Sequence, residues 1–264
     1  VWEVEATLKP GKRHAVPKRK YYYDEDNWGN AIIDGAGKLM NAMRKADGTY
    51  RTYDEMIKEG IETKYIGAFN TGPITTPLDI NTSQGSPCAE YNYGVFTAEV
   101  EVEVATGKVK VLAMHCVADP GPIGNYLAVD GQGYSGMMHS IGYALSEDYS
   151  DVKKHATLMG AGFPYIEMIP DGENFTVEYT QTPRPSGPYG SSGCSEMFQT
   201  SDHCAVINAI YHACGVHSYN LPATPARVKE ALEAKAKGTE LKPDPYYLGD
   251  DFYEKLDYMK ANQL

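Results

Sequence analysis

Alternating apolar and polar positions are clearest in the middle of the chain, where they predict a β-hairpin. Between Val95 and Val104, every second side chain from Phe96 onward is apolar, and three glutamates lie between them. This period of two places the apolar side chains on one face of a strand. Residues 105–108 form a turn and residues 109–117 return as a second strand, so the two are expected to pair.

Apolar residues spaced three and four positions apart predict five helices around this hairpin. Stretches rich in glycine, proline and polar residues separate them, and the longest are residues 63–90 and 183–196. Residues 160–180 contain a loop and a strand. We therefore predict an α+β fold, with mixed sheets and flanking helices. The expected helices span residues 29–44, 52–62, 129–145, 200–214 and 223–237.

The expected helix at residues 129–145 contains four glycines, at Gly131, Gly133, Gly136 and Gly142. Glycine weakens a helix, so several on one helix indicate that something approaches its backbone closely. A bound ligand and tight packing on a sheet both account for this pattern, and the sequence leaves the two open.

Composition divides the chain into three segments. Residues 1–28 are polar, carry two basic runs and are expected to be irregular. Residues 29–237 hold the hairpin and the helices, and we predict that they form one domain. Residues 238–264 form a tyrosine-rich tail. The first residue is Val1 rather than methionine, which indicates cleavage or a longer polypeptide.

Charge and cysteine usage narrow the class of protein. The 264 residues are 42% hydrophobic, which is enough for a buried core. The net charge of -11 argues against nucleic acid as a partner, and no apolar run reaches the roughly 18 residues of a membrane helix. The five cysteines include no Cys-x-x-Cys pair, which argues against zinc-ribbon and iron–sulfur sites within this chain and favours the reducing cytoplasm.

Three familiar kinds of site fail on their spacing. The nucleophile elbow of a serine hydrolase needs a glycine two positions after its serine, but Cys194 stands two positions after Ser192. The histidines and cysteines of residues 203–217 lack the spacing of four zinc ligands, so ordinary helix residues are the better interpretation. Residues 131–136 begin like a dinucleotide-binding loop but do not follow a clean strand.

Glu196 is different, because it follows a loop of glycines and serines and precedes an expected helix. The small residues before it let the backbone approach a ligand, and backbone amides there can meet an anion. A glutamate near a helix start also simply complements the helix dipole. Spacing alone does not decide between these two interpretations.

Six segments, in one order, resemble the C-terminal part of the molybdenum-binding region of the xanthine oxidase family. The similarity covers residues 29–235 and is strongest to bacterial aldehyde oxidoreductases that use molybdopterin cytosine dinucleotide. The fold class then becomes the C-terminal molybdenum-cofactor-binding domain of this family. The segments that carry the resemblance are residues 47–55, 93–108, 130–132, 141–148, 161–164 and 187–196.

The resemblance implies a catalytic role for Glu196. In the family, a glutamate at the end of such a loop is the general base beside molybdenum, where it takes the proton of a metal-bound hydroxide as the oxygen attacks carbon. Gly193, Cys194 and Ser195 match the cofactor-contacting residues before it. The family more often has Val-Gly where this chain has Cys194-Ser195, and a side chain there narrows the room beside the metal.

The resemblance also implies how the cofactor is held. Gly131 and Gln132 match a Gly-Gln pair that contacts the pterin, and Gln84, Gly85 and Ser86 match a stretch near the dinucleotide. Molybdenum is held through the pterin dithiolene, so no side chain of this chain is expected to ligate the metal. Family members carry small residues before the first matched helix, where this chain has the bulky and charged residues 18–26.

By this resemblance, the chain supplies half of a catalytic site. The implied reaction oxidises an aldehyde to a carboxylate, with water as the source of oxygen. Hydroxylation of an N-heteroaromatic is the alternative within the family, and a non-catalytic assembly subunit is the alternative outside it. The implied partners are a small-molecule substrate, the rest of the molybdenum domain and domains with [2Fe–2S] clusters, in an oligomer without membrane or nucleic acid.

Overall fold

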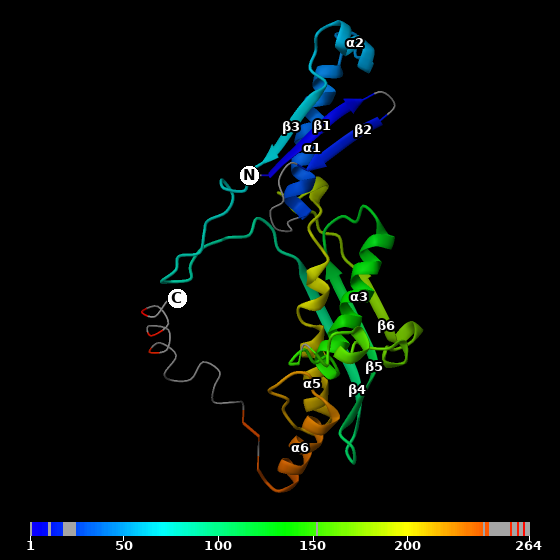
Figure 1. The fold of residues 1–264 in the computed structure, drawn as a ribbon, viewed down its shortest axis with the longest axis vertical. Coiled ribbons are helices and arrows are strands. Elements are labelled where there is room, and N and C mark those ends of the chain that lie inside the picture. Colours follow the sequence, from blue (N-terminus) through cyan, green and yellow to red (C-terminus); the bar gives the residue numbers. More distant parts are fainter. Residues whose placement is uncertain are drawn as a thin grey trace. The chain divides into compact units, whose positions relative to one another are not determined.

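The computed structural model describes residues 2–9, 12–17, 25–151, 153–239, 241–242, and 254, 258 and 261. The chain forms two compact units, whose elements are labelled in Figure 1. Unit 1 comprises residues 1–94, 117–129 and 179–194, and unit 2 comprises residues 95–116, 130–178 and 195–264.

Unit 1 is built on a three-stranded antiparallel sheet with the order β2-β1-β3. Helix α1 lies against β1 and β3 (Figure 1). Leu39 and Met43 of α1 pack with Met56 of α2 in a small buried cluster. The elements are β1 (Trp2–Lys9), β2 (Lys12–Pro17), α1 (Glu25–Met43), α2 (Tyr53–Lys58) and β3 (Lys64–Phe69).

Close backbone packing explains the Asp34-Gly35 pair, which interrupts the apolar pattern of the first expected helix. A side chain at Gly67 of β3 would overlap the backbone of Ala31 and Gly35, so only glycine lets the strand lie this close. Asp34 then accepts a hydrogen bond from the Ala68 amide at 2.8 Å. The helix is confirmed, and its irregular residues are the ones that contact the strand.

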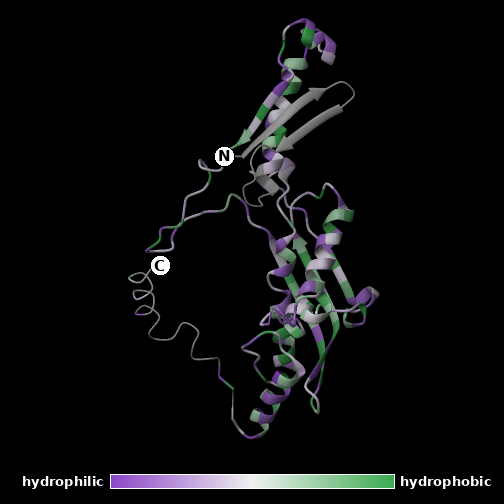
Figure 2. Cartoon of the chain, viewed as in Figure 1, coloured by the Kyte–Doolittle hydropathy of each residue, from purple (hydrophilic) through white to green (hydrophobic). Residues whose placement is uncertain are grey.

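Unit 2 is built on a second three-stranded sheet with the order β4-β5-β6. The central strand β5 carries hydrophobic residues along much of its length (Figure 2). The boundary between the units falls within β4, β5, α3 and β6. The elements are β4 (Tyr93–Glu103), β5 (Lys108–Asp119), α3 (Tyr126–Leu145), α4 (Leu158–Ala161), β6 (Phe175–Tyr179), α5 (Asp202–Cys214) and α6 (Pro225–Ala236), with short 3-10 turns η1 (Ile166–Met168), η2 (Gly172–Asn174), η3 (Pro188–Gly190) and η4 (Glu196–Gln199).

Helices α3, α5 and α6 supply much of the buried core of unit 2. Its fully buried side chains include Met114, Met137, Ile141, Phe198, Val206, Ile210 and Val228. Local signals bound two of these helices: the Thr224 hydroxyl caps the start of α6 by accepting from the Arg227 amide, and Gly215 ends α5 in the left-handed conformation. The predicted α+β class is confirmed.

Two expectations about the N-terminal third were wrong. Residues 1–28 were expected to be irregular, but they contain β1, β2 and the first residues of α1. Residues 63–90 were expected to be loop, but they contain β3. Both errors concern strands of one sheet, in which Trp2 pairs with Phe69 far along the chain. The bulky residues 18–24 and most of the tyrosine-rich tail lie outside the described residues.

Candidate functional site

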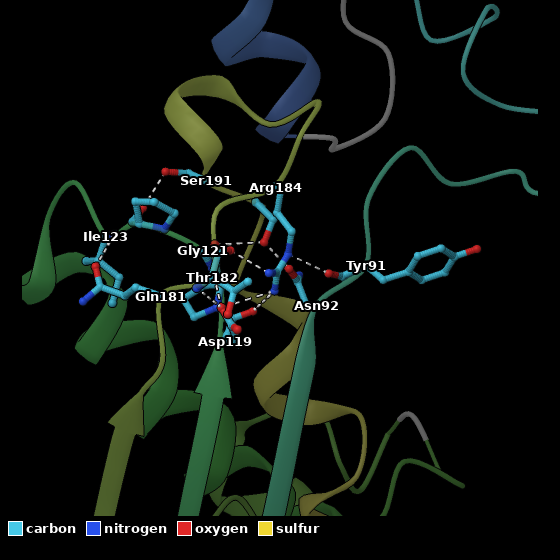
Figure 3. Close-up of polar contacts among 12 residues, drawn as sticks. Tyr91, Asn92, Asp119, Gly121, Ile123, Gln181, Thr182, Arg184 and Ser191 are labelled. Carbon is cyan, nitrogen blue, oxygen red and sulfur yellow. Dashed lines mark hydrogen bonds and ion pairs between the residues drawn. The ribbon is translucent and has the colours of Figure 1, made fainter.

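Arg184 is the centre of a polar network that holds the loop before Glu196 (Figure 3). Its guanidinium donates to the backbone carbonyls of Tyr91 at 3.1 Å, Thr182 at 2.6 Å and Asp119 at 2.6 Å. It also lies 3.3 Å from the Asp119 carboxylate and 5.3 Å from the centre of the Tyr93 ring. Arg184 is only 7% exposed, so this planar fork of donors joins three segments inside unit 1.

Asp119 is ionised within this network. Burial by itself raises the pKa of its carboxyl, but hydrogen bonds from Thr182 and Gly121 and the charge of Arg184 outweigh burial and lower the pKa to about 2. The Gly121 and Thr182 amides donate to the carboxylate at 3.1 and 3.0 Å. The pair therefore keeps its two charges at neutral pH.

Backbone hydrogen bonds extend the network along the loop of residues 183–193. The Arg184 amide donates to Gly190 O at 2.8 Å, and the Ser192 amide donates to Pro120 O at 2.8 Å. The Ser191 hydroxyl donates to Pro122 O (Figure 3). These contacts fix the loop against residues 119–125, which lead from β5 into α3.

Further contacts tie the same loop to α1 and to residues 90–92, before β4. Asn30 of α1 donates to Ser186 O at 2.6 Å, and the Ser186 amide donates to Glu90 at 2.6 Å. Asn92 donates to Gly193 O. The sequence showed a loop with almost no packing residues. The available signal was Arg184, a charged residue in a stretch otherwise made of small and turn-forming residues.

Glu196 stands at the start of η4, directly after this fixed loop. Its side chain is exposed and makes no hydrogen bond or ion pair with another described residue. The next two residues, Met197 and Phe198, are buried. The backbone directly after Glu196 is therefore anchored within unit 2, while its carboxylate remains available to a group outside this chain.

Helix α3 contains two glycines that allow close internal packing, Gly136 and Gly142, and one that does not, Gly131. A Cβ at Gly136 would lie 2.5 Å from the Cβ of Phe198, so this glycine lets α3 touch η4. Gly142 is likewise closed in by Glu147 and Pro164. A Cβ at Gly131 would meet no described atom within 4 Å, and both Gly131 and the adjacent Gln132 are exposed.

The structure places the predicted site residues in both units. Gly131, Gln132, Ser195 and Glu196 belong to unit 2. On α3, Gly136, which lies beside Phe198, follows Gly131 by five residues, or about 7.5 Å along the helix axis. The remaining predicted site residues, which belong to unit 1, are Gln84, Gly85, Ser86, Gly193 and Cys194.

Residues 84–86 form part of an exposed turn in unit 1. Thr76 and Ser86 pair through two backbone hydrogen bonds of 2.8 and 3.1 Å. Gly85 packs against the Pro77 carbonyl in a conformation with φ of 155° that suits glycine. The side chains of Gln84 and Ser86 are exposed, so they are available for contact with another molecule.

Within the described residues, no group of three histidine, cysteine, aspartate or glutamate side chains could hold a metal ion. The five cysteines, all within that part of the chain, form no disulfide. Burial raises the pKa of the Cys116 thiol to about 12, with a smaller contribution from the charge of Asp202, so this thiol stays protonated.

Asp202, at the start of α5, is a buried carboxyl that sequence reasoning missed. It is fully buried, and neither of its oxygens makes a hydrogen bond with a described residue. Burial raises its pKa to about 7. A polar residue just before a helix is usually an exposed cap, so nothing in the sequence marked this one as buried.

Comparison with known proteins identifies the class of domain. Residues 26–170, more than half of the chain, match the family model described as the molybdopterin cofactor-binding domain. The chain belongs to this family, in the xanthine oxidase group of molybdenum enzymes. Gly131, Gln132 and residues 84–86 lie within the matched range, and Glu196 lies after it.

Several relatives are aldehyde oxidoreductases. The one from Megalodesulfovibrio gigas is 50% identical over 206 residues, which is 78% of this chain and 22% of that protein. The solved aldehyde oxidoreductase of Desulfovibrio gigas matches 88% of this chain and 30% of its own, with a TM-score of 0.79 and 37% identity. The solved aldehyde oxidoreductase of Desulfovibrio desulfuricans matches 77% of this chain and 22% of its own, with a TM-score of 0.72 and 49% identity. The chain thus spans between a fifth and a third of these relatives.

No helix of the described residues is both long enough and apolar enough to span a membrane.

Proposed function

We propose that this chain forms part of a molybdenum-dependent oxidoreductase that converts an aldehyde to a carboxylate, with Glu196 as the general base. The observation that carries the proposal is the Glu196 carboxylate: it is exposed and unpaired among the described residues, and the two residues that follow it, Met197 and Phe198, are buried. The similarity to aldehyde oxidoreductases supports the choice of substrate class.

The residues around Glu196 fit a large, flat, polar cofactor. Gly131 leaves open space beside α3 where any other residue would place a side chain, and Gln132 offers an exposed amide with both donors and an acceptor. We propose that these two residues, with Gly193 to Ser195, hold molybdopterin, and that Gln84 to Ser86 contact its dinucleotide, cytosine dinucleotide being the expected form. When bound, the molybdenum group supplies oxygen transfer and accepts two electrons.

Glu196 then has one task, which is to accept a proton. Oxidation of an aldehyde by water yields a carboxylic acid, two protons and two electrons, and the attacking oxygen must lose a proton as it bonds to the carbonyl carbon. An ionised Glu196 can accept that proton at a carboxylate oxygen, provided it lies within hydrogen-bond reach of the attacking oxygen.

The remainder of such an enzyme must come from outside this chain. The chain corresponds to 22% of the Megalodesulfovibrio gigas relative, so most of a comparable protein lies beyond its residues. We propose that the rest of the molybdenum domain completes the cofactor site and that [2Fe–2S] clusters in a partner or further domain accept the electrons. We also propose a cytoplasmic location for the complex.

The test replaces Glu196 by glutamine in the native assembly. Glu196→Gln keeps the size of the side chain but removes the base, so we expect kcat for aldehyde oxidation to fall by about 10²- to 10⁴-fold. The matched control is Glu173→Gln, an exposed glutamate on η2 in the same unit, and it should retain activity.

Metal content and substrate panel separate the alternatives. Molybdenum per assembly, measured by mass spectrometry of the metal, should be equal in the wild type and both variants. Loss of less than tenfold in Glu196→Gln would remove the base assignment. If the assembly contains molybdenum but oxidises only N-heteroaromatics, the substrate is an N-heteroaromatic and not an aldehyde. If the assembly contains no molybdenum, the chain is a non-catalytic subunit.

A further inference from the structure

A polar cavity of about 220 Å³ lies within unit 2, where the second half of α3 faces the end of η4. It is lined by His139, Ser140 and Tyr143 of α3, by Glu147 just after that helix, and by Gln199, the last residue of η4. None of these residues belongs to the predicted cofactor site. The cavity is large enough for several water-sized groups.

Two of the side chains that line this cavity are buried and incompletely satisfied. Ser140 is 2% exposed and Glu147 is 9% exposed. The Ser140 hydroxyl and Glu147 Oε1 make no hydrogen bond with any described residue. The other carboxylate oxygen of Glu147 accepts a hydrogen bond from the Tyr149 hydroxyl at 2.7 Å.

A buried carboxylate of this kind needs compensation. Buried polar groups in proteins nearly always have hydrogen-bond partners, and buried charges are paired or bind ions. Within the part of the chain that the structure describes, Glu147 forms no ion pair. The two histidine rings nearest the cavity pack edge-on against other rings, His139 on Phe163 and His203 on Tyr143, each with ring centres 5.0 Å apart. Water could fill the cavity, but it would leave the negative charge without a counter-charge.

We propose that this cavity is a binding site for a monovalent alkali cation, K⁺ or Na⁺. Oxygen atoms of a carboxylate, hydroxyls and an amide are the ligands that hard cations prefer, and Glu147, Ser140, Tyr143 and Gln199 supply that set. A single carboxylate balances a single positive charge. The described residues contain no group of three histidine, cysteine or acidic side chains that would suit a divalent metal.

The site would connect α3 and η4, which also approach each other at Gly136 and Phe198. Gln199 ends the same short turn that Glu196 begins, whereas Ser140 and Glu147 lie at the C-terminal part of α3. A bound cation therefore holds η4 against α3 from a second point. This inference stands independently of the catalytic role proposed for Glu196.

The test is hydrogen exchange by mass spectrometry on the native assembly, in KCl, NaCl, choline chloride or MgCl₂ at equal ionic strength. Binding to the folded state lowers the population of locally open molecules by the factor 1 + [cation]/Kd. At a concentration ten times Kd, K⁺ or Na⁺ should slow exchange in peptides covering residues 139–149 and 197–200 about tenfold relative to choline.

Variants make the test specific. Glu147→Gln removes the charge without changing the shape, and it should abolish the response to K⁺ and Na⁺. Ser140→Ala, a smaller change, should reduce it. Glu167→Gln, an exposed glutamate in the same unit, should respond like the wild type. The proposal is overturned by equal exchange in choline and alkali salts, by an unchanged response in Glu147→Gln, or by a response to Mg²⁺ alone.

Discussion

Asp119 is partly buried and Asp202 is fully buried, and their surroundings drive their ionisation in opposite directions. Asp119 accepts two backbone hydrogen bonds and lies beside Arg184, and its pKa falls to about 2. Asp202 has no hydrogen-bond partner among the described residues, and burial raises its pKa to about 7. At neutral pH the first is ionised, and about half of the second is protonated.

The contrast shows that compensation, and not burial alone, decides the state of a buried acid. Asp119 organises a loop because its charge draws donors from its own loop, at Gly121, and from Thr182 and Arg184 (Figure 3). Asp202 organises nothing that the described residues show, and its charged form is costly. The loop of residues 183–193 therefore depends on a satisfied charge, whereas the start of α5 tolerates an unsatisfied one.

Removing Arg184 should have the largest effect on stability. Arg184→Ala leaves the partly buried Asp119 without its cation, and loss of one partner of a fully buried pair, about 3–5 kcal/mol, is the upper limit of the expected cost. We expect a lower midpoint in denaturant and faster hydrogen exchange in residues 183–193. Arg184→Lys keeps the charge but loses the planar fork, so its loss should be smaller. A loss under about 1 kcal/mol in Arg184→Ala would mean that the network is incidental.

Asp202 should make stability fall as pH rises. Its pKa is higher in the folded state than the ordinary value of 3.8, so the folded protein binds the extra proton. The contribution of Asp202 to the free energy of unfolding is therefore fully present below pH about 4. It declines between pH about 4 and pH about 7, by up to about 4 kcal/mol at 1.36 kcal/mol per pH unit. Asp202→Asn should remove this slope, as measured by unfolding at several pH values. An unchanged slope would show that Asp202 is solvated.

Asp119 should act in the opposite direction and in a lower range. Its pKa is depressed in the folded state, so its contribution is complete above pH about 4 and is lost as pH falls to about 2. The expected loss is about 2 kcal/mol. Asp119→Asn should remove the dependence of the free energy of unfolding on pH between about 4 and about 2, and at no other pH. If Asp119→Asn also changed the slope between pH 5 and 7, the two aspartates would not be independent.

The smallest expected effects come from identical residues in different surroundings on α3. Gly136→Ala would place a methyl group 2.5 Å from the Cβ of Phe198, and overpacking of this kind costs about 1–3 kcal/mol. Gly131→Ala meets open space, and better helix propensity should leave stability equal or raised by up to about 1 kcal/mol. Thermal unfolding of both variants measures the difference. Equal losses would mean that Gly131 also serves packing.

By contrast, cofactor content should respond to Gly131→Ala if the proposed cofactor contact is right. The substitution fills the space that the pterin would occupy, so molybdenum per assembly should fall although the fold is unharmed. Full molybdenum content with full stability would place the cofactor elsewhere.

The sequence by itself determined the elements whose signal is local. The period of two across residues 95–117 became β4 and β5, and the apolar spacing of residues 129–145 became α3. Caps at Thr224 and Gly215 were readable, because a cap depends on its own few neighbours. The similarity to the molybdenum enzymes also rested on short runs of residues, and the family match confirms it.

Only the tertiary structure decided which polar residues have hydrogen-bond or charge partners and which glycines are closely packed. Strand β3 pairs with β1 across more than fifty intervening residues, so no local pattern revealed it. Arg184 and Asp119 lie 65 positions apart, and their pairing emerges only when the loops meet. Gly131 and Gly136 look alike in the sequence, but only one of them touches Phe198. Burial and compensation are properties of the neighbours that folding brings together, and those neighbours are distant in the chain.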